Sequence, residues 1–341
     1  MGRSVCRFGD HNNGDAMNQT MQLCPAGNLG PGIHSGVPMT DYLSDPCPLP
    51  SLSASCALTI DTASPAHAAA NHPRLGGAPA EYSKKADVGT AAHDVLFGGE
   101  GCVVFVEAED WRTKFAQQQR DDARAAGKVA LLARQRGELE AMVSAARAFC
   151  ADAGILHIIE AGVPEETVIW EERGEGVPVL DPEGNPRMVH PHFWFRARPD
   201  LMSYDAATNT TTMLHYKTTE ASANPAKFIP GIMRSMGYAF TLRFYARGAA
   251  AIAASGHHEL ANCQQLILVQ EQFAPYACSL IALDPASIAI ADARVSRAVA
   301  TWKKCLASGK WPAYTTAVHY AEPTAWELAA AEAASAEGGE A

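Results

Sequence analysis

The hydrophobic pattern between residues 192 and 219 predicts two β-strands joined by a turn. The runs HFWFRARPD and TTMLHYKTT are rich in the aromatic and β-branched residues that strands favour. Asp205 and Asn209 lie between them and suit a turn. We therefore expect two adjacent antiparallel strands, the first ending at Asp200 and the second carrying Lys217 near its end. This arrangement places a carboxylate and an ammonium group at the same end of a small sheet.

The rest of the chain shows an alternation of helical and strand patterns. Apolar residues between 129 and 150 recur at helical spacing and predict an amphipathic helix. The order of elements predicts an α/β fold, with a central mixed β-sheet flanked by helices. Helices are expected at about 86–97, 129–150, 225–254 and 286–308, and further strands at 166–171 (ETVIWE), LILVQE and ACSLIALD.

The composition changes along the chain and suggests three parts. Residues 1–31 are rich in Gly, Asn and Met, show little periodicity and are expected to be disordered. Residues 32–320 carry the periodic elements and are expected to form a single domain. Residues 321–341 are rich in Ala and Glu and are expected to form a flexible acidic tail.

Composition and charge then exclude several classes of protein. A hydrophobic content of 48% in 341 residues is ample for a core, and no run of 18 apolar residues predicts a membrane span. No secretory signal is evident and the nine cysteines form no C-x-x-C pair, so we expect a cytoplasmic protein with reduced thiols. A net charge of −10 argues against general adhesion to nucleic acid, but it leaves room for a focused basic cleft.

The Asp200–Lys217 pair suits metal-assisted phosphodiester hydrolysis, because a carboxylate holds a hard cation and a lysine orients or activates the attacking water. A nucleotide-binding alternative lacks support, since no glycine-rich phosphate motif follows a strand. His190 and His192 form a second candidate metal pair, but they have no Cys or Glu ligands at a recognisable spacing, and we interpret them as structural.

An ordered series of short segments resembles the PD-(D/E)xK nuclease superfamily, and within it the RecE-like (exodeoxyribonuclease VIII type) exonucleases of phages and prophages. The resemblance extends from about Gly32 to about Tyr314. In addition to the Asp200 and Lys217 runs, the segments are GIHSGVPMTDYLSDPCPLPSLSAS, SPAHAAANHPRL, ADVGTAAHDVLF, DWRTKFAQQQRDDARAAGK, PEETVIWEE, LILVQEQFAPYACSLIALD and ASGKWPAY.

The resemblance implies a metal site and a set of catalytic residues. Lys217 and Asp200 would be catalytic, and His93 from the GTAAH stretch, Asp200 and His215 would hold Mg²⁺ or Mn²⁺. The supporting positions implied by the resemblance are Glu166, Thr218, Tyr238 and Tyr245.

Two positions depart from the family pattern. The motif has Asp or Glu two residues before the lysine, where this chain has His215. Strand alternation keeps residues 215 and 217 on one face, but imidazole suits Mn²⁺ better than Mg²⁺. On the following helix the usual glutamine is replaced by Thr241. The alternatives are therefore a nuclease with altered metal preference and a nuclease fold that has lost cleavage; Glu220 is a weaker candidate for a migrated acid.

The resemblance also implies partners: double-stranded DNA ends, a single-strand annealing protein, and further copies of the chain in a ring. The expected function is metal-dependent degradation of double-stranded DNA from an end during phage-type recombination. The alternative is a weakened or inactive protein that binds DNA ends or a recombination partner. A basic strip offers phosphate contacts, or else a solvated helix face. It comprises Arg112, Lys114, Arg120, Arg124, Lys128, Arg134 and Arg136.

Overall fold

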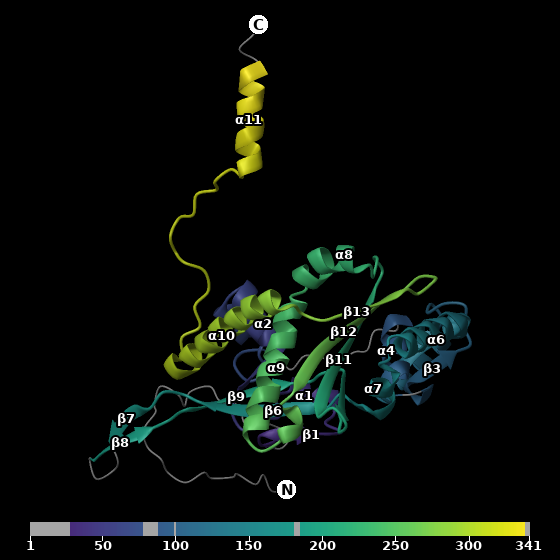
Figure 1. The fold of residues 1–341 in the computed structure, drawn as a ribbon, viewed down its shortest axis with the longest axis horizontal. Coiled ribbons are helices and arrows are strands. Elements are labelled where there is room, and N and C mark those ends of the chain that lie inside the picture. Colours follow the sequence, from purple (N-terminus) through teal and green to yellow (C-terminus); the bar gives the residue numbers. More distant parts are fainter. Residues whose placement is uncertain (1–27, 78–87, 99, 181–184, 338–341) are drawn as a thin grey trace.

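The fold is built on two β-sheets (Figure 1), and the chain passes from one to the other at residues 198–200, between β9 and β10. The computed structural model describes residues 28–77, 88–98, 100–180 and 185–337. The first sheet has the order β1 (Gly32–His34), β6 (Thr167–Arg173), β9 (His192–Ala197), β2 (Ser51–Ser53). The second has the order β13 (Cys278–Ile281), β12 (Cys263–Glu271), β11 (Thr210–Thr219), β10 (Leu201–Asp205), β5 (Val163–Pro164).

The second sheet is mixed, as expected, because β11 and β12 run parallel while the other pairs are antiparallel. Two small sheets are separate: β3 (Val103–Val106) with β4 (Val129–Leu132), and an arm formed by β7 (Val177–Leu180) and β8 (Pro186–Val189). The helices are α1 (Met39–Leu43), α2 (Ala54–Thr62), α3 (Pro65–Asn71), α4 (Val88–Gly98), α5 (Lys114–Ala125), α6 (Arg136–Asp152), α7 (Leu156–Ala161), α8 (Pro225–Phe228), α9 (Tyr238–Ala254), α10 (Pro285–Ser308) and α11 (Ala325–Glu337).

Alternating side chains on β11 divide the core into two parts. Met213 faces the cluster that contains α9, α2 and α10. Leu214 and Tyr216 face the opposite cluster, which contains α4, α6 and α7. Because strand residues point to opposite faces in turn, His215 and Lys217 share the α9 side with Met213. None of the helices in the described ranges is long and apolar enough to cross a membrane.

The prediction that the Asp200 run pairs with the Lys217 strand is wrong. The run HFWFRA forms β9, which pairs with β6 and β2 in the first sheet. A separate short strand, β10, forms the hairpin with β11. Pro199 has no N–H to donate to a ladder, which explains why the strand stops and the chain changes sheets there. Asp200 therefore begins the hairpin instead of ending the preceding strand.

Two other predicted elements differ from the structure. The helix expected at 129–150 begins only at Arg136, because the four apolar residues of β4 form a buried strand. The helix expected at 225–254 is interrupted at Gly237, whose φ of +67° cannot continue a right-handed helix. The tail expected to be flexible contains α11. Residues 1–27 of the expected disordered segment lie outside the described residues, whereas the helix around His93 is confirmed as α4.

A buried ionic network fixes β9 just before the crossing. The Asp45 carboxylate accepts hydrogen bonds from the backbone N–H of Ser51 at 2.8 Å and from its hydroxyl at 2.6 Å. Arg196 on β9 lies 3.2 Å from the same carboxylate and donates to the Ser51 carbonyl at 2.7 Å. Asp45 and Arg196 are 0% and 4% exposed, so the buried Arg196 charge depends on Asp45 for compensation, while Asp45 also has Arg74 at 3.9 Å.

We predict that Asp45→Asn lowers the free energy of unfolding by about 3 kcal/mol or more, because it leaves the Arg196 guanidinium buried without a counter-charge. Urea denaturation followed by circular dichroism measures the change. Asp152→Asn, at an exposed position on α6, is the matched control and should change stability by no more than about 0.5 kcal/mol. Equal effects of the two substitutions would contradict the role assigned to the network.

Candidate active site

Asp200 is the centre of a charged cluster at the crossing between the two sheets. One of its oxygens, Oδ2, accepts a hydrogen bond from the backbone N–H of Tyr216 at 2.9 Å and from Lys217 Nζ at 3.0 Å. His93 Nε2 lies 3.7 Å from the same oxygen. Burial alone would raise the pKa of Asp200, but the charge of Lys217 and the hydrogen bond from His93 hold this pKa well below its ordinary value.

His93 reaches this cluster from α4 and is held in one orientation. Its Nδ1 lies 3.2 Å from Oδ1 of the neighbouring Asp94, which turns Nε2 toward Asp200. The Phe97 ring meets the imidazole edge-on, with ring centroids 5.2 Å apart. Burial alone would lower the pKa of His93, but Asp200 and Asp94 outweigh it and raise the pKa to about 9. Without an ion, the imidazole is therefore a cation beside Asp200 at neutral pH.

This donor set fits a metal ion through two protein ligands. Among the described residues, the hydrogen bonds that the Asp200 side chain accepts all end on Oδ2, so Oδ1 remains available to a cation. A metal-binding histidine usually donates its second ring nitrogen to a carboxylate, which is the arrangement of His93 and Asp94. Over the described ranges, however, no group of three or more His, Cys, Asp and Glu side chains is placed to share one ion.

The structure does not bring His215 into this donor set. Its side chain shares the face of Lys217, as strand alternation predicts, but it is only 4% exposed and its Nε2 lies 3.2 Å from Gln265 Oε1. Its ring packs against Tyr245 with centroids 5.3 Å apart. Burial lowers the pKa of His215 and favours the neutral imidazole. In this conformation His215 is a packed core residue near Asp200.

The four supporting positions lie in different surroundings. Thr218 accepts a hydrogen bond from Gln272 Nε2 at 2.8 Å and packs under α4. The hydroxyl of Tyr245 donates to the carbonyl of Arg198 at 3.2 Å and so braces the crossing that carries Asp200. Tyr238 instead packs against Phe228 in a third apolar cluster, and Glu166 accepts a hydrogen bond from Ser35 at an exposed position.

The other sequence candidates lie outside the cluster. Glu220 is exposed in the turn after β11. His190 Nδ1 lies 3.1 Å from the Gly174 carbonyl and His192 Nδ1 lies 2.9 Å from Glu171 Oε2. The two histidines therefore have separate hydrogen-bond partners.

A cleft runs from the cluster toward α5 and contains residues that the sequence did not single out. A cavity of about 200 Å³ is lined by His93, Asp94, Glu165 and Arg198, and it shares the last two with a cavity of about 620 Å³. Arg198 Nη2 donates to Glu165 Oε2 at 2.8 Å. The only sequence signal for these residues was proximity, because Asp94 adjoins His93, Glu165 adjoins Glu166, and Arg198 is two residues before Asp200.

Two members of the basic strip line the larger cavity, namely Arg124 at the end of α5 and Lys128 just before β4. The others lie outside its lining: Arg120 is paired with Asp121 at 3.2 Å, and Arg112 is 91% exposed. Lys114 begins α5 at an exposed position, while Arg134 follows β4 and Arg136 opens α6. Through the shared residues Glu165 and Arg198, the cavity lined by His93 thus adjoins the cavity lined by Arg124 and Lys128.

Comparisons with known proteins give a likeness among solved structures. No protein family model and no curated protein matches the sequence. Among solved structures, a crystal structure from Eubacterium rectale that is provisionally described as an exonuclease aligns with 85% of this chain and 94% of its own, at 10% sequence identity and a TM-score of 0.42. A likeness at this level leaves the function to be argued from the site itself.

We predict that Gly89→Ala displaces His93. A Cβ atom at residue 89 would lie 2.5 Å from both Thr218 Oγ1 and Gln272 Nε2, so either these two hydrogen-bonded side chains or α4 must shift, and we expect α4 to move away from β11. The expected loss of stability is about 1–3 kcal/mol by urea denaturation. Gly137→Ala on α6, where a Cβ meets nothing within 4 Å, is the matched control and should be neutral or stabilising by up to about 1 kcal/mol. Unchanged stability of Gly89→Ala would show that α4 does not depend on this contact.

Proposed function

We propose that this chain is a metal-dependent nuclease with a PD-(D/E)xK-type core that degrades double-stranded DNA from an end. The observation that carries the proposal is the convergence of His93, Asp200 and Lys217 at the crossing between the sheets. The adjoining cleft extends to Arg124 and Lys128, which offer positive charge at a distance from the cluster. Phosphate contacts of this kind position a duplex without reading its sequence.

In this proposal Asp200 Oδ1 and His93 Nε2 would hold Mg²⁺ or Mn²⁺. When bound, such an ion neutralises developing negative charge on the phosphate and lowers the pKa of water. Asp94 holds the His93 ring in place through Nδ1. Lys217 is 32% exposed and uses one proton for Asp200, which leaves two donors to orient a water molecule or a phosphate oxygen.

The details beyond hydrolysis rest on the sequence resemblance to RecE-like enzymes. By that resemblance the products would be single-stranded overhangs, and an annealing protein would take them up during phage-type recombination. The cytoplasmic location expected from the sequence would bring the enzyme to its DNA substrate.

A second candidate is a DNA-end binder that does not cleave. The observation that favours it is the state of His215: the motif acid is absent, and the histidine in its place is buried and paired with Gln265. Among the described residues this leaves Asp200 as the one carboxylate assigned to the ion, which is fewer than hard cations prefer. The cleft and its basic residues would serve binding equally well.

Digestion of end-labelled linear duplex DNA with Mg²⁺ or Mn²⁺ separates the two candidates. For a nuclease, we predict metal-dependent digestion of the end-labelled DNA. The rate of digestion should fall at least about 100-fold in Lys217→Ala, because the water or phosphate loses its positioning group. Lys227→Ala, at an exposed position on α8, is the matched control and should digest DNA at the wild-type rate.

The same samples are tested for DNA binding by gel shift. Retained binding with no cleavage in either ion would establish the second candidate. Absence of both binding and cleavage would contradict both.

A further inference from the structure

The C-terminal helix α11 is a formed element whose two large apolar side chains are exposed. Figure 1 shows it standing away from the two sheets at the end of an extended segment. Trp326 and Leu328 are 77% and 51% exposed. A helix of only 13 residues is marginally stable in water on its own. Exposed apolar side chains on such a helix therefore point to a surface that it covers.

The sequence nevertheless specifies where this helix starts. The Thr324 hydroxyl accepts a hydrogen bond from the Glu327 N–H at 3.3 Å, and the Glu327 carboxylate accepts one from the Thr324 N–H at 2.7 Å. This reciprocal pair is a capping box, which fixes the first turn of a helix. The helix is therefore encoded locally, and its stability in solution depends on finding a surface to cover.

One face of α11 is suited to an apolar groove. Trp326, Ala329 and Ala330 recur at helical spacing and form a stripe with one large anchor and small neighbours. The helix contains three glutamates and no lysine or arginine, so its charge is negative. A complementary surface would be an apolar groove with basic ends.

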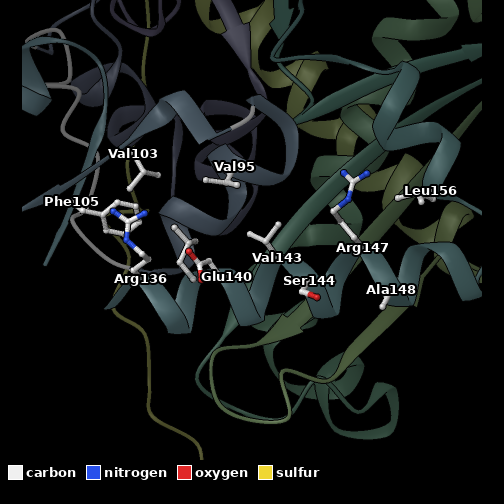
Figure 2. Close-up of a pocket in the computed structure, with 11 residues that line it drawn as sticks. Val95, Val103, Phe105, Arg136, Glu140, Val143, Ser144, Arg147, Ala148 and Leu156 are labelled. Carbon is white, nitrogen blue, oxygen red and sulfur yellow. The ribbon is translucent and has the colours of Figure 1, made fainter. Parts of the chain in front are cut away.

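Such a groove lies between α6, α4 and β3 (Figure 2). Its volume is about 780 Å³, and Val95, Phe105, Val143 and Leu156 are among its apolar lining residues. Arg136 and Arg147 stand toward its two ends in Figure 2. They are separated by three turns of α6, or about 16 Å, which is close to the length of about 20 Å for α11.

The charges at the groove are partly engaged but remain exposed to a partner. The Arg136 guanidinium lies 3.9 Å from the centre of the Phe105 ring, and Arg147 donates to Glu160 at 2.8 Å. Arg147 is 43% exposed. Glu140 is the acidic residue in the lining, four residues after Arg136 on the same helix.

We propose that α11 of one copy of this chain docks in the α4–α6–β3 groove of a second copy. The second copy is favoured because α10, from which the segment to α11 departs, and α6 lie on opposite sides of the second sheet in Figure 1. Trp326 fills the apolar middle of the groove, and the acidic residues of α11 meet Arg136 and Arg147. Because helix and groove are different surfaces, the contact is head-to-tail and every copy offers both halves.

Two variants test the contact, and each removes one of its two surfaces, the helix or the groove. The first ends after Glu322 and lacks α11. The second carries Ser144→Glu and Ala148→Glu, two exposed positions beside the groove that repel an acidic helix without disturbing the core. Light scattering after size-exclusion chromatography gives the mass of each, and circular dichroism confirms that both are folded.

We expect the wild-type chain to have a mass of two or more copies of 36.2 kDa and each variant alone to be a single copy. Mixing the variants should restore a one-to-one pair, since one supplies the helix and the other the groove. A wild-type mass of one copy would overturn the proposal, as would truncation that leaves the assembly intact or a mixture that stays monomeric. A wild-type monomer in which the Trp326 side chain is shielded from a fluorescence quencher would also overturn it, because the helix would then dock within its own chain.

Discussion

The position of the Asp200 carboxylate depends on a change of sheet, and the rest of the site depends on Asp200. Pro199 ends the ladder of β9, and the chain enters β10 one residue after Asp200. A single oxygen of this carboxylate then receives the Tyr216 N–H and the Lys217 ammonium, with His93 within 3.7 Å. Buried anions are retained only where donors compensate them, so the strand, the lysine and α4 are held together by one group.

The network around Asp45 and the hydroxyl of Tyr245 hold the crossing from the other side. Arg196 is fixed to Asp45 two residues before Arg198, whose carbonyl accepts the Tyr245 hydrogen bond. Helix α4 has a double role in this arrangement. It carries His93 toward the cleft and Val95 toward the groove proposed for α11. A helix bound in the groove would therefore contact the same helix that positions the histidine.

The sequence was informative where local patterns decide the structure. The hairpin turn at Asp205 and Asn209, the helix carrying His93 and the mixed sheet followed from periodicity and turn chemistry. The pairing of β9 could not be deduced, because its partners β6 and β2 are distant in sequence and an apolar run does not specify its neighbours. The same limit applied to β4, whose four apolar residues were absorbed into a neighbouring helical pattern.

For the site, the sequence identified His93, Asp200 and Lys217, and the structure places them together. It could not show that His215 turns to Gln265, because the rotamer depends on a residue 50 positions away. Nor could it find Glu165 and Arg198, whose pairing at the cleft wall depends on the crossing itself. The requirement for a glycine at residue 89, where α4 meets β11, is likewise visible only in three dimensions.

The central claim, that Asp200 is the ligand around which an ion would bind, is tested most directly by calorimetric titration of Mn²⁺ into the wild-type chain and into Asp200→Asn. Asp205→Asn is the matched control, since Asp205 lies at the far end of β10, the strand that begins one residue after Asp200, and caps the hairpin turn. The account predicts one Mn²⁺ site in the wild-type and Asp205→Asn chains and its loss in Asp200→Asn. Equal Mn²⁺ binding by the wild-type and Asp200→Asn chains would contradict it.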